Sequence, residues 1–305
     1  MKKLLTMASI MLAGLSGVAQ VLQVRAVEKV PIASVTDLKA AAFSPAGDYL
    51  LLTTQGNKNL YRLSVADGAL TTISEAEGAG YRPLVSADGR SVVYCTKRIS
   101  ENHLRATSLE SYNVVTGEQV SLVEPTRELQ GYAVAGNTAV TVEQGTARRR
   151  ALSRGAAPSE TATPMVYIKN RQLMLSQGND IKTLSPNGLQ ESYIWPSLSP
   201  AGDKVLYYVC GVGAFVCDLS GNIVARLGAL RAPQWYDNSV VVGMNDRDDG
   251  HTVVASSIVA TTLTGESQTL TPDSLIAMFP QTCERAGRIA FTTADGELYM
   301  IQLEK

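Results

Sequence analysis

The sequence predicts an all-β fold, a six-bladed β-propeller. Three observations carry the prediction: a repeated strand–turn–strand unit, apolar second strands, and a short final unit. The repeated unit occupies residues 42–52, 83–94 and 195–207, with weaker copies at 233–242 and 279–291. Each copy has a short strand, a turn rich in Gly, Pro, Asp or Asn, and a second, apolar strand. Self-similarity at this spacing is the mark of a repeat architecture.

The number of blades follows from the turns of the repeat. Turn residues fall at six positions, namely Gly47, Gly89, Gly136, Gly202, Asn238 and Gly287. Later hairpin signals such as Asp67-Gly68 and Gly221-Asn222 supply a third and a fourth strand to each unit. The alternative is a β-sandwich. It is disfavoured because segments 50–52, 205–209 and 240–242 are apolar on both faces, whereas strands with one wet face alternate.

The last unit ends without a fourth strand, because the chain stops shortly after residues 297–301. Residues 21–27 alternate like a strand with one covered face and have no obvious local partner. We therefore predict a propeller closed by the N-terminal strand, which completes the last blade and leaves no open edge there.

The third unit contains a predicted insertion, residues 144–164. It carries Arg148, Arg149, Arg150 and Arg154 among small residues. The favoured interpretation is a solvated loop, since few large apolar residues are available to pack it. The alternative is a basic contact surface.

The first 19 residues have the layout of a secretory signal peptide. Lys2 and Lys3 precede an apolar run over residues 4–15, and small residues lead up to Ala19. Cleavage is expected near Ala19-Gln20, which leaves residues 20–305 as a single propeller domain in a periplasmic or extracellular location. The position after the cleavage point is not Cys, so a lipoprotein anchor is disfavoured. No later stretch has the length of a membrane span.

Charge excludes some partners. The formal net charge is −1, and it becomes −3 without Lys2 and Lys3. This balance creates no field that would attract nucleic acid or an anionic membrane, so we expect neither. The content of 45% hydrophobic and 18% charged residues is that of a packed domain.

The four cysteines are Cys95, Cys210, Cys217 and Cys283. In an exported protein a hairpin that turned at Gly213 would allow a Cys210–Cys217 disulfide. The alternative is that both are small core residues, because a hydrophobic core of this size needs no disulfide for stability. Both interpretations stay open on the sequence.

An acidic segment, residues 245–251, lies between apolar strands. The favoured interpretation of this segment is an acidic turn that binds no metal. We expect no cofactor. The alternative is a calcium site with Asp246, Asp248 and Asp249 among its ligands, since that ion prefers oxygen. The segment lacks the Glu that ends an EF-hand loop. The two histidines, His103 and His251, are paired by no motif with a nucleophile.

Residues just before the inner strands should surround the entrance to the central channel. Arg82, Tyr193, Trp195 and Arg231 are the candidates for binding there, because aromatic and Arg side chains carry much of the energy at interfaces. Trp235 is instead expected between blades.

The segments 44–48 and 199–203 both read Ser-Pro-Ala-Gly-Asp, and Trp195-Pro196 precedes the second. They resemble the repeat of the TolB-like β-propeller family, although Ala46 and Ala201 stand where that family usually has Asp. The resemblance covers residues 20–305. It implies a periplasmic or surface protein, which is either a scaffold of envelope complexes or a propeller domain of the kind that accompanies a separate peptidase domain. It supplies no catalytic residues.

The function expected from the sequence is therefore a non-enzymatic, exported propeller. It would be monomeric and bind a protein, or a glycan, of the bacterial cell envelope. Hydrolase, metalloprotease and nucleotide-binding motifs are missing from the sequence. The alternative is a propeller hydrolase or lyase with paired carboxylates at the channel mouth.

Overall fold

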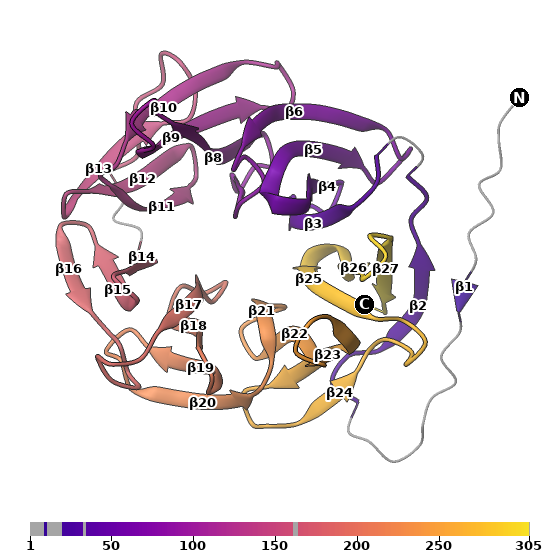
Figure 1. The fold of residues 1–305 in the computed structure, drawn as a ribbon. Helices are drawn as coiled ribbons and strands as arrows, with labels where there is room; N and C mark the ends of the chain where they lie inside the picture. The colour runs from indigo at the N-terminus through magenta and orange to yellow at the C-terminus, as the bar shows by residue number, and fades with distance from the viewer. Residues whose placement is uncertain (1–8, 11–19, 33–34, 161–163, 305) are drawn as a thin grey trace, which may run out of the picture.

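Seven β-sheets stand around a central opening in the computed structural model, which describes residues 9–10, 20–32, 35–160 and 164–304 (Figure 1). The sheets follow one another around the ring in chain order, and the first strand of each lies innermost. The fold is therefore a seven-bladed β-propeller, whose sheets we call blades 1 to 7. The prediction of six blades is wrong.

The blades differ in strand number. Blade 1 consists of β3 (Leu38–Phe43), β4 (Tyr49–Thr54), β5 (Lys58–Ser64) and β6 (Leu70–Glu77). Blade 2 consists of β7 (Leu84–Val85), β8 (Ser91–Ile99), β9 (Arg105–Asn113) and β10 (Gln119–Thr126). Blades 3 and 4 consist of β11 (Leu129–Ala135), β12 (Thr138–Glu143) and β13 (Thr146–Ala151), then β14 (Pro164–Lys169), β15 (Gln172–Gln177) and β16 (Asp180–Thr183).

Blades 5 and 6 again have four strands each. They are β17 (Tyr193–Leu198), β18 (Lys204–Val209), β19 (Gly213–Asp218) and β20 (Ile223–Gly228), then β21 (Arg231–Trp235), β22 (Val240–Asp248), β23 (Val253–Thr262) and β24 (Ser267–Thr269). Blade 7 contains β25 (Ala277–Cys283), β26 (Arg288–Thr293), β27 (Leu298–Leu303), β2 (Val24–Lys29) and β1 (Ser9–Ile10). Two short 3₁₀ turns, Gln55–Asn57 and Glu284–Ala286, complete the described elements.

The miscounted blade lies in residues 129–183, which form two blades instead of one blade with an insertion. The sequence hides the first turn of blade 4, because Asn170 and Arg171 make it with φ values of 49° and 68° and neither Pro nor Gly marks it. Hairpin turns with two left-handed residues usually contain Gly at one of them. A turn with Arg in that position leaves no signal in the sequence.

The predicted insertion is also corrected. Residues 146–151 form strand β13, which pairs with β12 through a tight turn at Gln144 and Gly145. Arg148, Arg149 and Arg150 therefore belong to a strand and not to a loop. The pattern was missed because three consecutive arginines lack the apolar alternation that predicts a half-buried strand.

The second strand of each blade is packed between neighbouring blades. Leu50, Leu51 and Leu52 of β4 are all fully buried, on both faces of the sheet. Apolar clusters fill the space between adjacent blades, such as the contact of Leu206 and Val216 in blade 5 with Trp235 and Val241 in blade 6. This burial on both faces explains why the second strands do not alternate.

The N-terminal strand β2 lies beside the C-terminal strand. β2 pairs antiparallel with β27, with Val27 opposite Ile301, and the Val30 amide donates to the Leu298 carbonyl. The paired strand begins at Val24, a few residues later than the 21–27 segment taken from the sequence. Of residues 1–19, which hold the predicted signal peptide, only Ser9 and Ile10 are among the described residues.

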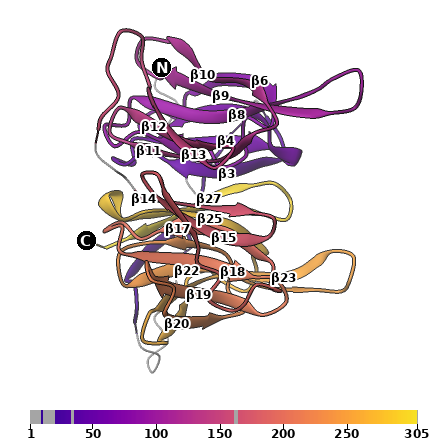
Figure 2. The same ribbon diagram turned by 90° about the vertical axis from the view of Figure 1, so that its left-hand side faces the viewer.

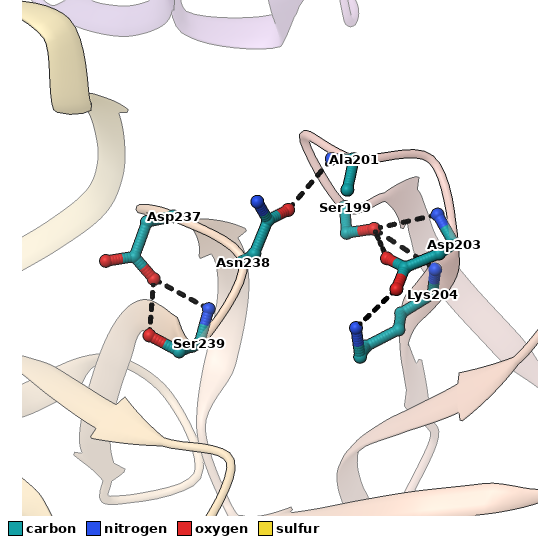
Figure 3. A network of polar contacts seen from close by, with 7 residues as sticks. All are labelled: Ser199, Ala201, Asp203, Lys204, Asp237, Asn238 and Ser239. Atoms are coloured by element: carbon teal, nitrogen blue, oxygen red, sulfur yellow. Dashed lines mark hydrogen bonds and ion pairs between the residues drawn. The ribbon is translucent and has the colours of Figure 1, made fainter.

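A serine organises the turn between the first and second strands in several blades. In blade 5 the Ser199 hydroxyl donates to Asp203 Oδ1 at 2.8 Å and accepts the amides of Asp203 and Lys204 (Figure 3). The Ser44 hydroxyl in blade 1 donates to Asp48 and accepts the Tyr49 amide. The Ser86 hydroxyl in blade 2 donates to Asp88 and accepts the Ser91 amide, and all three serines are buried. The turn of blade 5 also contacts blade 6, since Ala201 donates to Asn238 Oδ1.

Ser199→Ala is expected to lower the free energy of unfolding by about 1 kcal/mol, because two partly buried amides lose their acceptor. Urea denaturation followed by tryptophan fluorescence measures the change. Ser220→Ala is the control, since Ser220 is exposed and its change should be close to zero. Equal stability of the two variants would show that the Ser199 network does not stabilise the turn.

All four cysteines are among the described residues, and none of them forms a disulfide. The hairpin of blade 5 turns at residues 210–212, so Cys210 lies exposed in the turn while buried Cys217 pairs with Val205. A Cys210–Cys217 disulfide is therefore not formed. The register pairs Val209 with Gly213, so the turn lies two to three residues earlier than a Cys210–Cys217 bridge would require.

Iodoacetamide at pH 8 should label Cys210 first in the native protein. Burial raises the pKa of Cys95 to about 11 and that of Cys217 to about 12, so neither forms the reactive thiolate at that pH. Peptide mapping by mass spectrometry identifies the labelled thiol. All four cysteines should react after denaturation without a reductant, and recovery of a linked Cys210–Cys217 peptide would contradict the structure.

No helix among the described residues has the length and apolar character needed to cross a membrane.

Candidate functional site

The inner strands begin with an unusual backbone conformation. In four blades the residue before a proline has a left-handed φ of 45–54°, and these residues are Arg82, Trp195, Ala232 and Phe279. In blades 5, 6 and 7 this residue lies in a register shift between the first and second strands. Left-handed backbone at a residue other than Gly costs of order 1–3 kcal/mol and persists only where the surroundings hold it. The repeat therefore builds a distorted start into several inner strands.

A cavity of about 430 Å³ lies against the inner strands of blades 2 to 5. We call it the inner-strand cavity. Its lining includes Tyr81, Arg82, Lys97, Gln130, Tyr132, Tyr167, Tyr193, Trp195 and Pro196. Its volume lies within the range of sites that bind small ligands.

Arg82 is held in place by contacts with two other blades. Its Nη2 donates to the carbonyl of Pro196 in blade 5 at 2.7 Å. Its own carbonyl accepts a hydrogen bond from the Tyr132 hydroxyl of blade 3 at 2.9 Å. A guanidinium has five N–H donors, and only this one has a partner among the described residues. Arg82 thus presents a fixed positive charge with free donors at the cavity.

Lysines near the inner strands lie over aromatic rings. Lys97 Nζ is 5.2 Å from the ring centroid of Tyr81, which is 49% exposed. In the neighbouring blade 1, Lys39 Nζ of β3 lies 4.0 Å from the ring centroid of Phe279 in blade 7. Burial lowers the pKa of Lys39, since the charged form is poorly solvated there. Cation–π contacts of this kind orient the ammonium groups without neutralising them.

The titratable groups that line the inner-strand cavity are tyrosines, Lys97, Arg82 and Cys95. Its described lining contains neither a carboxylate nor a histidine. Burial raises the pKa of Cys95 to about 11 and raises the pKa of Tyr132 well above its ordinary value, so both remain protonated at neutral pH. A neutral thiol and a neutral phenol act as hydrogen-bond donors and not as a nucleophile or a base.

The structure brings together three of the four predicted binding residues. Arg82, Tyr193 and Trp195 all line the inner-strand cavity. Tyr193 is only 1% exposed, and its hydroxyl accepts the Asn187 amide and donates to the Gly188 carbonyl, so it supports the wall. Arg231 lies in blade 6 outside this lining, where Nη1 is 2.7 Å from Asp246 Oδ2.

Lys97, Tyr132 and Tyr167 were missed by the sequence reasoning. Lys97 lies in the later part of the long strand β8, past the apolar segment that the repeat identifies. Tyr132 and Tyr167 belong to the inner strands of blades 3 and 4, where the blade boundaries were wrong. A correct assignment of those two blades would have placed both tyrosines beside the channel.

The acidic segment of blade 6 belongs to the β22–β23 hairpin, which extends from the disc (Figure 2). The Asp246 side chain is 1% exposed and pairs with Arg231, whereas Asp248 is exposed and lies 3.9 Å from Arg231 Nη1. Backbone amides of Thr252 and His251 bind Asp249 and lower its pKa. Among the described residues no group of three or more His, Cys, Asp or Glu side chains is placed to hold a metal ion.

Comparison with known proteins supports the fold. No family model matches the sequence, and no curated protein matches it. A solved oligogalacturonate lyase from Vibrio parahaemolyticus is similar, with a TM-score of 0.62 and 13% identity over 98% of this chain and 97% of that one.

Two further solved structures are similar. One chain of a mitotic checkpoint complex has a TM-score of 0.57 and 11% identity over 97% of this chain and 99% of that one. The Cps50 (Swd1) β-propeller domain of Myceliophteria thermophila has a TM-score of 0.54 and 8% identity over 88% of this chain and 98% of that one. Identities this low establish the β-propeller fold alone.

Proposed function

We propose that this chain is an exported binding module, without catalytic activity of its own, that binds an acidic oligosaccharide of the cell envelope. The ligand would occupy the inner-strand cavity. The observation that carries the proposal is the fixed guanidinium of Arg82, whose free donors face a cavity rich in aromatic side chains.

The chemistry of the lining favours a glycan that bears carboxylates. Arg82 and Lys97 supply positive charge, and a guanidinium binds a carboxylate through paired hydrogen bonds. Tyr81 and Trp195 supply aromatic surface on which the apolar face of a sugar ring can pack. The cavity volume suits a short oligosaccharide better than the flat surface of a folded protein partner, which buries hundreds of square ångströms per side.

The lining also supports a binding role over catalysis. Glycosidases use a pair of carboxyl groups about 5–10 Å apart, and the described lining has no carboxylate. The oligogalacturonate lyase shares the fold with this chain at 13% identity, so its activity does not transfer by similarity. Export is supported by the layout of residues 1–19.

Isothermal titration calorimetry tests the proposal with the chain lacking residues 1–19. Trigalacturonic acid is the acidic probe, and the neutral galactotriose is its control. We expect binding of the acid alone, weakened by added salt, and full recovery of the intact sugar after prolonged incubation. Binding of neither sugar, or of both equally, would contradict the ligand class. Conversion of the acid to an unsaturated product would contradict the non-catalytic role.

A further inference from the structure

Blades 3 and 4 are one strand short. Each has three described strands, whereas every other blade has at least four. In blades 1, 2, 5 and 6 the fourth strand follows the third along the chain. In blade 7 the strand outside β27 is β2, which comes from the other end of the chain. The propeller therefore accepts an outer strand from a distant segment.

The outer edge of β13 presents unpaired backbone groups. The amide of Leu152 donates to the carbonyl of Asn137 at 3.1 Å, so Leu152 is a hydrogen-bonded position of the β12–β13 pair. Every second residue of β13 before it then bonds to β12 as well, and the residues between them do not. The backbone groups of Arg148 and Arg150 face β12, and those of Ala147, Arg149 and Ala151 face outward. Within the described part of the chain these outward groups have no backbone partner.

Free positive charge lies along the same edge. Arg148 and Arg149 are exposed and have no ion-pair partner among the described residues. The neighbouring Arg150 differs, because its Nη2 is 2.8 Å from Glu143 Oε1. Two arginines that lack counter-charges, one on each face of a strand, favour an acidic segment beside them.

A cavity beside β13 leaves room for added side chains. It has a volume of about 500 Å³. Its lining consists of Val140 of β12, Ala147 and Arg149 of β13, residues 157–160 of the segment that follows β13, and Gly178 and Asn179 of blade 4. In a complete blade the side chains of a fourth strand pack against the neighbouring blade, as Ala225 and Leu227 of β20 do in the cluster with Trp235. The cavity is where corresponding side chains of blade 3 would fit.

We propose that the outer edge of β13 receives an acidic, extended segment of a partner protein as the fourth strand of blade 3. Backbone hydrogen bonds to Ala147, Arg149 and Ala151 would supply affinity, and Arg148 and Arg149 would select for acidic side chains. The site is independent of the inner-strand cavity. The opposite interpretation is that the arginines guard an open edge against any added strand.

A fluorescent acetylated peptide that alternates Glu with Val tests the site, and the same peptide with Lys in place of Glu is the control. Anisotropy should show binding of the Glu peptide alone. Hydrogen exchange should slow at the amides of Ala147, Arg149 and Ala151 when the peptide is present. Failure of the Glu peptide to bind, or equal binding of the Lys peptide, would establish that the arginines guard the edge.

Variants locate the contact. The double variant R148E/R149E should bind the Glu peptide at least about tenfold more weakly. The variant R247E, which exchanges one exposed arginine of blade 6 for glutamate, should bind normally. A147P removes one outward amide without touching a bond to β12, and it should abolish binding while the melting temperature stays nearly constant. Normal binding by a folded A147P variant would overturn strand addition at β13.

Discussion

Val27→Asp is expected to unfold the protein or to reduce its stability by more than about 4 kcal/mol. Val27 is fully buried in the apolar cluster of blades 6 and 7, opposite Ile301 of β27. A carboxylate at this position would lie among Ile289, Phe291 and Ile301 with no cation to pair with it. The loss is comparable with the whole stability of many domains, which is about 5–15 kcal/mol.

Circular dichroism during urea denaturation measures the effect of Val27→Asp. The control is Arg25→Asp, which places the same side chain on an exposed position of β2 and should change the stability by less than about 0.5 kcal/mol. If both variants unfolded at the urea concentration of the unsubstituted protein, the packing of β2 against β27 would be refuted. If both lost stability equally, charge in β2 and not burial would be the cause.

Arg82→Ala is expected to weaken binding of the acidic oligosaccharide by about 10- to 100-fold, the loss for hydrogen bonds made by a charged group. The affinity of Arg82→Lys should lie between that of Arg82→Ala and that of the unsubstituted protein. Lysine keeps the positive charge but lacks the two parallel N–H donors that pair with a carboxylate. Calorimetry with trigalacturonic acid measures these affinities. Added salt should weaken the remaining binding less in Arg82→Ala than in the unsubstituted protein, since one charge contact is already gone.

The control for Arg82 is Arg90→Ala. Arg90 is exposed at the turn between β7 and β8, outside the lining of the inner-strand cavity. The affinity of the Arg90→Ala variant for trigalacturonic acid should equal that of the unsubstituted protein. A melting temperature of Arg82→Ala close to normal separates lost binding from lost structure, because the Pro196 contact is a single hydrogen bond at a partly exposed site. Unchanged affinity in a folded Arg82→Ala variant would remove Arg82 from the site.

Much of the fold could be predicted because its signals are local. Two patterns are repeated in the sequence, the turns at Ser44, Ser86 and Ser199 and the apolar second strands. Each serine turn connects the first strand of a blade to the second, and each apolar strand is packed between blades. The additional blade, blade 4, could not be found in this way. Its turn at Asn170 and Arg171 lacks Gly and Pro, and its neighbour β13 carries three arginines in a row.

The candidate site was predicted only in part, because only some of its residues belong to local patterns that the sequence shows. Arg82 and Trp195 were identified because they are Arg and aromatic residues close to the predicted inner strands of recognisable repeats. Tyr132 was not, since its hydrogen bond to the Arg82 carbonyl joins residues 50 positions apart. Arg231 was placed with the others from its position before a strand, yet its guanidinium is held by Asp246 of the adjacent strand.

The β-propeller fold could be predicted from the chain alone, because turn chemistry and apolar patterning act over a few neighbouring residues. The number of blades, the open edge of β13 and the set of side chains at the inner-strand cavity became known only from the folded molecule. These features depend on how whole sheets pack together, and no short segment of the chain contains that information.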